Sequence, residues 1–315
     1  MNKFQDKQLY LGIDGGGTKC RAIIYEPSLG KLAEAVSGPA NVLRGAENAI
    51  ANIIRATDEA LANLSLPAEY KSELLAGIGL AGLNLESCLN EMKLWNHPFK
   101  QAYFTSDLHI ACIGAHSGKD GAVMIIGTGS SALVSIDGQV KEVGGHGFPV
   151  GDCGSGAWLG LKAIETTLQS LDRVKEPSPF TEAVAKLYQI ETAIDLAQTV
   201  SYFLPVDYAK VAPLVMEHFN AYDKYAERFV KVGAEYLSNV AKQLVDNTLV
   251  ANDKSSSVNE LPLALIGGLA PLMSEHFDPE VKAKIKKADN PPEIGAVLFA
   301  QMKSKNTEQS ICDIN

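Results

Sequence analysis

The stretch that decides the fold is YLGIDGGGTKCRAIIYE, residues 10–26. Its residues predict a strand, a glycine turn and a second strand, with Asp14 where the first strand ends. The three consecutive glycines can adopt positive φ, and they let a bulky anion approach bare backbone N–H groups. The sequence therefore predicts a first phosphate loop, residues 15–19, made of Gly15, Gly16, Gly17, Thr18 and Lys19.

Asp14 indicates a metal ion beside this loop. A carboxylate at the mouth of a phosphate-binding turn would repel bare phosphate unless a divalent cation bridged the two. We therefore expect Mg²⁺ next to Asp14. An ordinary β-hairpin is the alternative for this stretch taken alone, because Asp-Gly and Gly-Gly are common turn residues.

Two better-known phosphate loops do not fit the stretch. A Walker loop places Lys before Ser or Thr after its last glycine, whereas Thr18 precedes Lys19 here. A dinucleotide fingerprint requires a helix directly after the glycines, whereas CRAIIYE is β-branched and alternates.

The opening pattern recurs about a hundred residues later in GAVMIIGTGSSALVSIDGQV, residues 121–140. Gly127, Thr128, Gly129 and Ser130 form the second phosphate loop, residues 127–130. Two such units predict a duplicated α/β fold with two lobes. We expect the loops to face one another across a cleft and to hold the two sides of one triphosphate.

These segments resemble the two phosphate motifs of the superfamily of actin, sugar kinases and heat-shock chaperones. LPLALIGGLAPLM, with Gly267 and Gly268, resembles its adenosine motif. From about residue 9 to about residue 303 the chain resembles the BadF/BadG/BcrA/BcrD ATPase family. Within that family it is most similar to the N-acetylglucosamine and glucosamine kinases.

The resemblance implies a two-lobed actin-like ATPase fold of the duplicated ribonuclease H type, with an interlobe cleft. We expect an N-terminal lobe at 1–118, joined by the C-terminal helix at 291–315, and a C-terminal lobe at 119–290. The implied activity is transfer of the γ-phosphate of ATP, with Mg²⁺, to the 6-hydroxyl of an amino sugar.

Asp107 is the predicted catalytic residue. KQAYFTSDLHIACIGAH predicts a strand, a break and a helix, with Asp107 at the junction. Ser106 and Asp107 are also ordinary helix caps. A carboxylate beyond the carboxyl end of a strand lies where ligands bind in α/β sheets, and the resembled kinases place their catalytic Asp in this context. We expect Asp107 to orient the sugar hydroxyl and accept its proton.

The substrate residues are carried over from the resemblance. It implies that Asn41, Gly151 and Asp152 contact the sugar. From the residues alone, Asn41 could cap the following helix and Asp152 could be the N-terminal acid of a helix that begins near Ser155.

Two amino sugars and two other functions stay open. N-acetylglucosamine is favoured over glucosamine. An ATP-driven dehydratase activator would hold an iron–sulfur cluster between subunits, and Cys112 and Cys153 are its conceivable ligands. A non-catalytic actin-like ATPase would need neither Asp107 nor the glycine-rich segment around Asp152.

Composition excludes several partners. A formal charge of −9 disfavours nucleic-acid binding, and no apolar run is long enough for a membrane span. The five cysteines include no Cys-x-x-Cys pair, so we expect reduced thiols and a cytoplasmic protein. We further expect a homodimer.

The remaining stretches give coarser expectations. Glycines in LLAGIGLAGLN, residues 74–84, predict close approach of another backbone or a ligand. Residues 160–251 read as mainly helical, and residues 225–244 carry an apolar stripe. Residues 252–260 read as a solvated linker, and the tail KNTEQSICDIN, residues 305–315, as frayed.

Overall fold

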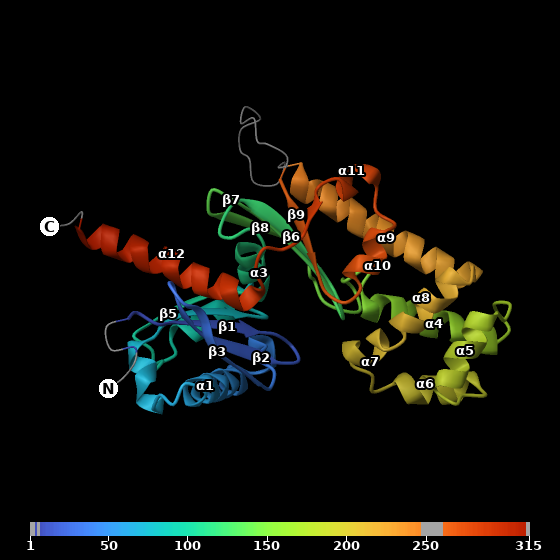
Figure 1. The fold of residues 1–315 in the computed structure, drawn as a ribbon. Coiled ribbons are helices and arrows are strands. Elements are labelled where there is room, and N and C mark those ends of the chain that lie inside the picture. Colours follow the sequence, from blue (N-terminus) through green and yellow to red (C-terminus); the bar gives the residue numbers. More distant parts are fainter. Residues whose placement is uncertain (1–3, 5–6, 247–260, 313–315) are drawn as a thin grey trace. The chain divides into compact units, whose positions relative to one another are not determined.

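The computed structural model describes residue 4, residues 7–246 and residues 261–312. The chain divides into two compact units, Met1–Asp120 with Lys287–Asn315 and Gly121–Lys286. Each unit contains one five-stranded sheet with helices packed on it (Figure 1). The expected linker at 252–260 lies outside the described residues.

The first unit contains these elements: β1 (Tyr10–Gly15), β2 (Cys20–Glu26), β3 (Gly30–Ser37), η1 (Val42–Arg44), α1 (Ala46–Ala62), η2 (Ala68–Glu73), β4 (Leu75–Leu80), α2 (Glu86–Lys93), β5 (Gln101–Ser106), α3 (Asp107–Ala115) and α12 (Pro292–Cys312). The strand order is β3-β2-β1-β4-β5. β1 pairs antiparallel with β2 and parallel with β4, and β4 pairs parallel with β5.

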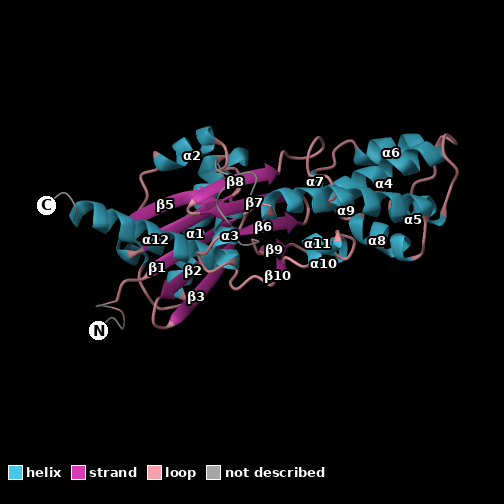
Figure 2. Cartoon of the chain, turned by 90° about the horizontal axis from the view of Figure 1, so that it is seen from above, coloured by secondary structure: helices cyan, strands magenta, loops and turns pink. Residues whose placement is uncertain are grey.

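The second unit contains these elements: β6 (Gly121–Ile126), β7 (Ser130–Ile136), β8 (Gln139–Gly144), α4 (Gly156–Leu171), α5 (Pro179–Leu187), α6 (Ala193–Val200), α7 (Pro205–Ala209), α8 (Ala212–Asn220), α9 (Lys224–Val245), β9 (Leu263–Ile266), α10 (Ala270–Ser274), α11 (Pro279–Lys282) and β10 (Ile285–Lys286). The strand order is β10-β9-β6-β7-β8. The predicted helical segment is α4 to α9, shown as helices in Figure 2.

The two sheets share one topology. In each, the first strand of the unit lies in the centre, with two antiparallel strands on one side and two parallel strands on the other. The strands form because their side chains alternate or are wholly apolar, as in the buried run of β4. The predicted duplicated α/β fold is therefore confirmed.

α12 packs directly on β1 and β4 because the strands carry glycine at the contacts. A methyl group added at Gly77 would lie 1.8 Å from the carbonyl oxygen of Ala296, and one at Gly12 would lie 2.2 Å from that of Glu293. The close approach expected of the glycines at 74–84 is confirmed at Gly77, and the approaching backbone is α12.

One smaller expectation is wrong, and another is met except at one residue. The tail is helical as far as Cys312, since residues 304–312 contain no glycine or proline to end the helix. In the stripe on α9, Phe229 and Leu244 are buried and Tyr225, Tyr236 and Val240 pack against the same core, but Val232 is 45% exposed. Gly233 takes the packed position there, and a methyl group on it would lie 2.9 Å from the Cα of Gly154.

In the described part of the chain, no helix combines the length and the apolar character that a membrane crossing requires.

Candidate active site

The first phosphate loop leaves two of its glycines uncovered. It joins β1 to β2, and the N–H of Gly16 donates to the carbonyl of Lys19 at 2.9 Å. A methyl group at Gly17 would have no neighbour within 4 Å, and one at Gly16 would have its nearest at 3.9 Å. Thr18 and Lys19 are exposed. Backbone N–H groups in so open a turn can be approached by an anion.

The three glycines do not use the positive φ that glycine permits. None of Gly15, Gly16 and Gly17 has φ in the left-handed region. Gly15 is required by packing instead, since a methyl group there would lie 2.4 Å from Leu80 Cδ2 and 2.9 Å from Ala40 Cβ. The run thus combines one closely packed position with two open ones.

Asp14 lies at the end of β1 in an unfavourable place for a negative charge. Burial, together with the carboxylates of Asp107 and Glu293, raises the pKa of its carboxyl to about 6. Arg21 and Lys19 lower the pKa but do not cancel these effects. Asp14 therefore pays a free-energy cost for being ionised, which a nearby cation would offset.

A divalent cation fits these surroundings. Among the described residues, no group of three or more His, Cys, Asp or Glu side chains is arranged to hold a metal ion. Mg²⁺ is commonly held by one or two carboxylates, with water and substrate phosphates completing its shell. Asp14 beside an open phosphate loop matches that pattern.

Asp107 is the first residue of α3, directly after β5. Ser106 caps the helix through its hydroxyl, which accepts from the N–H of His109 at 3.2 Å. Asp107 Oδ1 accepts from the N–H of Leu108 at 2.9 Å. The predicted strand and helix, with Asp107 at their junction, are confirmed, but no break separates them, and Ser106 supplies the cap. Asp14 pairs with Gly79, and Gly79 pairs with Thr105, so Asp107 follows β5 at the same edge of the first sheet as Asp14.

Asn41 precedes η1 and caps it. Its Oδ1 accepts from the N–H of Leu43 at 3.0 Å. The capped element is the 3₁₀ turn η1, whereas α1 begins after Gly45. The capping alternative is thus realised through the amide oxygen, and the amide nitrogen is left as a donor for another partner.

The second phosphate loop is held in place by α4. The N–H of Gly156 donates to the carbonyl of Gly127 at 2.8 Å, and that of Ala157 donates to the carbonyl of Thr128 at 3.0 Å. Ser155 caps α4 by accepting from the N–H of Trp158, as the predicted helix start requires. Thr128 is exposed at the tip of the loop.

Ser130 is buried at the start of β7. Its hydroxyl donates to the carbonyl of Cys153 at 3.1 Å, and its N–H lowers the pKa of Asp152 by hydrogen bonding. Ser130 therefore links the second phosphate loop to the segment that precedes α4.

Asp152 lies against the second phosphate loop. It has a left-handed φ of 61°, and its Oδ1 accepts from the N–H of Gly147 at 3.3 Å. Its Oδ2 would lie 2.8 Å from a methyl group at Gly129, which explains the glycine there. Burial raises the pKa of the carboxyl above its usual range, although hydrogen bonds and His146 oppose the rise. Gly151 precedes it, with its N–H donating to the carbonyl of Gly147.

Gly267 and Gly268 follow β9 and differ in role. A methyl group on Gly267, whose φ is 110°, would lie 2.3 Å from the carbonyl oxygen of Ile126 at the end of β6. A methyl group on Gly268 would meet no atom within 4 Å. Gly267 thus packs the β9 turn beside the second phosphate loop, and Gly268 leaves backbone uncovered.

Glu293 is a site residue that the sequence reading missed. It is 4% exposed near the start of α12, and its carboxylate lies 3.3 Å from the Nη1 of Arg21. The same Arg21 nitrogen lies 2.7 Å from Glu34. Glu293 is a lone charge in the otherwise apolar segment PPEIGAVLFA, which is the signal that could have identified it.

Comparison with known proteins places the chain in a family. The BadF/BadG/BcrA/BcrD ATPase family profile matches residues 11–300. The chain is 30% identical over 299 residues to a glucosamine kinase of Vibrio cholerae, covering 94% of this chain and 97% of that protein. It is 26% identical to an N-acetylmuramic acid/N-acetylglucosamine kinase of Clostridium acetobutylicum, covering 92% of this chain and 97% of that protein. The chain belongs to the BadF/BadG/BcrA/BcrD ATPase family.

Solved structures support the fold. A provisionally named N-acetylglucosamine kinase from Chromobacterium violaceum matches with a TM-score of 0.83 and 27% identity, covering 93% of this chain and 99% of that one. A hexokinase of the ROK family from Thermus thermophilus matches with a TM-score of 0.55 and 16% identity, covering 94% and 99%. The fold is that of the two-lobed actin-like ATPases and sugar kinases.

Proposed function

We propose that this protein is an ATP-dependent kinase that phosphorylates the 6-hydroxyl of an amino sugar, with N-acetylglucosamine as the favoured substrate. One observation carries the proposal: Asp14 and Asp107 lie at the carboxyl ends of two parallel strands of the first sheet, and Asp14 directly precedes an open phosphate loop. The amino-sugar kinases among the relatives support the substrate class.

The proposed roles divide among the chain's own residues. Open backbone N–H groups of the two phosphate loops bind phosphate oxygens of ATP, and Gly267 and Gly268 accept the adenosine. Mg²⁺ at Asp14 supplies neutralisation of the phosphate charge. Asn41, Gly151 and Asp152 bind the sugar.

Asp107 orients the 6-hydroxyl and holds its proton during transfer. The bond from the sugar oxygen to the γ-phosphorus forms, the bond from the γ-phosphorus to the ADP oxygen breaks, and the proton passes to the Asp107 carboxylate. Little covalent chemistry is asked of the protein, so the rate comes from alignment and charge stabilisation.

Glucosamine is the second candidate, and Asp152 is the reason. Burial raises the pKa of its carboxyl, so its ionised form would gain from a neighbouring ammonium group. An acetylated nitrogen carries no such charge. The relative of Vibrio cholerae, named as a glucosamine kinase, supports the same alternative.

Neither remaining alternative gains support from the structure. Cys112 is 1% exposed within α3, so it is poorly placed to ligate a cluster shared between subunits. A non-catalytic ATPase would give no reason for the proximity of Asp107 to Asp14.

The test is a coupled assay of ADP release with Mg²⁺ and a panel of hexoses and hexosamines. We expect strong stimulation by N-acetylglucosamine, a sugar 6-phosphate as product, and a higher kcat/KM for it than for glucosamine. The reverse order would establish the glucosamine alternative. ADP release that no sugar stimulates would refute the kinase proposal.

We further propose a cytoplasmic homodimer. The apolar stripe of α9 supplies no obvious interface, since Phe229 and Leu244 are buried within the second unit. Light scattering on the purified protein would give the mass, and a monomeric mass would contradict the dimer.

A further inference from the structure

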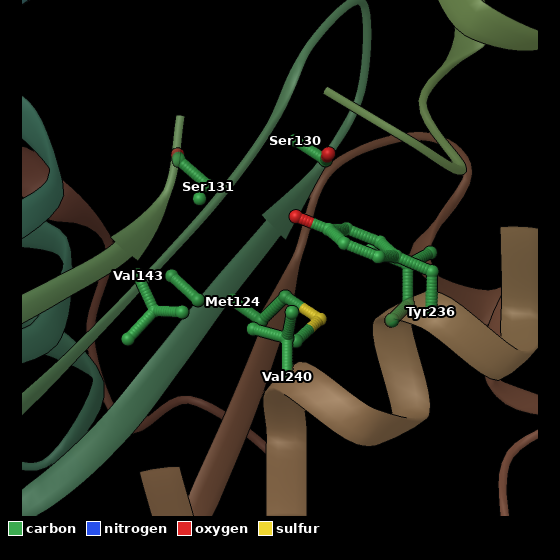
Figure 3. Close-up of a pocket in the computed structure, with 9 residues that line it drawn as sticks. Met124, Ser130, Ser131, Val143, Tyr236 and Val240 are labelled. Atoms are coloured by element: carbon green, nitrogen blue, oxygen red, sulfur yellow. The ribbon is translucent and has the colours of Figure 1, made fainter. Parts of the chain in front are cut away.

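A small pocket lies on the core side of the second phosphate loop, between α9 and the β6-β7-β8 part of the sheet (Figure 3). Its polar lining comes from Ser130, Ser131 and Tyr236, and its apolar lining includes Met124, Val143 and Val240. We propose that this pocket holds one ordered water molecule, through which Tyr236 acts as a positioning residue for the second phosphate loop.

The volume of the pocket suits one water. The volume open to the centre of a water-sized sphere is about 10 Å³. A site needs roughly 10–15 Å³ of this volume to hold a single water molecule. A bound water also needs two to four polar partners, so a site of this size stays dry when its walls are wholly apolar. The serines and the tyrosine make the walls of this pocket mixed.

The hydroxyl of Tyr236 is directed into the pocket. Figure 3 shows the ring reaching from α9 toward the end of the pocket where Ser130 and Ser131 lie. A methyl group built on Gly144, the last residue of β8, would lie 3.6 Å from Tyr236 Oη. The hydroxyl therefore sits close to the backbone at the adjoining ends of β7 and β8.

Tyr236 Oη is within reach of water. Tyr236 is half-buried, and its hydroxyl is not one of the fully buried polar atoms that lack a hydrogen-bond partner in the described ranges. The neighbouring hydroxyl of Ser130 is committed to the carbonyl of Cys153 at 3.1 Å. Water in the pocket would satisfy the phenol without disturbing that bond.

The position of the pocket connects it to the proposed site. The carbonyl of Ser130 accepts from the N–H of Gly145 at 3.1 Å, so the second phosphate loop and the end of β8 are joined there. Burial raises the pKa of Tyr236, and the charges of Cys153 and Asp152 raise it further, so the hydroxyl keeps its proton and can donate. A donor at this point stabilises the base of the loop in one conformation.

The inference rests on the proposed function only because it assumes that the second phosphate loop binds the nucleotide. Two variants, Tyr236→Phe and Val143→Ile, test the role of the water. Tyr236→Phe removes the hydroxyl and keeps the ring. Tyr225→Phe is the matched control on the same helix, because Tyr225 Oη donates to the carbonyl of Glu176 at 2.9 Å, away from the pocket. Val143→Ile fills the pocket while leaving the Tyr236 hydroxyl intact.

The readouts are crystal structures and the Kd of ADP by calorimetry without sugar. We expect an ordered water in the wild-type pocket and none in Tyr236→Phe or Val143→Ile. Loss of the hydrogen bond through this water should raise the Kd of ADP roughly 3- to 10-fold in both variants. The Kd of the control, Tyr225→Phe, should stay within about twofold of wild type.

A dry wild-type pocket, or wild-type ADP affinity in Tyr236→Phe, would overturn the inference. Failure of the kinase proposal gives a different result: wild-type protein binds ADP, but no sugar stimulates ADP release. Should Tyr236→Phe not fold, the same comparisons with Val143→Ile decide the question.

Discussion

Asp107, the first residue of α3, raises the pKa of Asp14 near the end of β1. The strands that lead to them, β5 and β1, are separated in the sheet by β4. Both residues stand at the carboxyl ends of parallel strands, where α/β sheets bind ligands. We therefore expect different roles for the two carboxylates: Asp14 binds a cation, and Asp107 accepts a proton.

Replacing Asp107 by Asn should remove the proton acceptor and keep the helix start. We expect kcat to fall by about 10²- to 10⁴-fold, the usual contribution of a general base. The Kd of ATP, measured by calorimetry, should change little. Glu47→Gln, an exposed acid in the first turn of α1, is the control. Undiminished turnover in Asp107→Asn would remove Asp107 from the mechanism.

Replacing Asp14 by Asn should stabilise the protein when no divalent cation is present. The pKa of Asp14 in the folded protein, about 6, lies above the ordinary value of 3.8. The contribution of the Asp14 carboxyl to the free energy of unfolding is therefore fully present below pH 4 and is lost as the pH rises through 6. At pH 7.5 the ionised carboxylate destabilises the fold by up to about 3 kcal/mol.

The measurement for Asp14 is Tm in EDTA at pH 5 and pH 7.5. The Tm of Asp14→Asn should exceed that of wild type at pH 7.5, by a smaller margin at pH 5. Excess Mg²⁺ should narrow the difference by stabilising wild type alone. A variant that melts below wild type at pH 7.5 in EDTA would contradict the assigned burial and repulsion.

His109 should make the first unit sensitive to acid. Burial, together with the charge of Lys303, lowers the pKa of its imidazole to about 4. The neutral ring lies 2.7 Å from the hydroxyl of Thr105 and packs edge-on against Phe299. Because the folded pKa lies below the unfolded one, stability is present above about pH 6.5 and is lost as pH falls toward 4.

The check for His109 is urea unfolding of wild type and His109→Gln between pH 7 and pH 4.5. Wild type should lose on the order of 2 kcal/mol more over that range than the variant. His276→Gln, which changes an exposed histidine, is the control. Parallel pH profiles for wild type and His109→Gln would count against this account.

Gly77→Ala should destabilise the first unit. The added methyl would lie 1.8 Å from the backbone oxygen of Ala296, so α12 must shift. Such overpacking typically costs about 1–3 kcal/mol, seen as a lower Tm. Gly268→Ala is the control for stability, since its methyl would meet no atom within 4 Å. Equal Tm values for the two variants would show that the contact is looser than described.

The fold was largely predictable because its signals are local. The strand–glycine–strand units predicted the two sheets, and the residues around Asp107 predicted a strand end and a helix start. Contacts between distant segments were not predictable. No spacing reveals that Asp152 fills the space beside Gly129, or that Gly15 is a packing position rather than a φ requirement. Glu293 was missed because its relation to Asp14 exists only once α12 packs on β1.

The return of α12 to the first unit has a consequence for the order of synthesis. β1 and β4 present bare glycine backbone at Gly12 and Gly77, and α12, which begins at residue 292, packs on that backbone. Every strand of the second sheet is therefore synthesised before α12 can pack on the first sheet. On a growing chain, the half made first is the half that matures last.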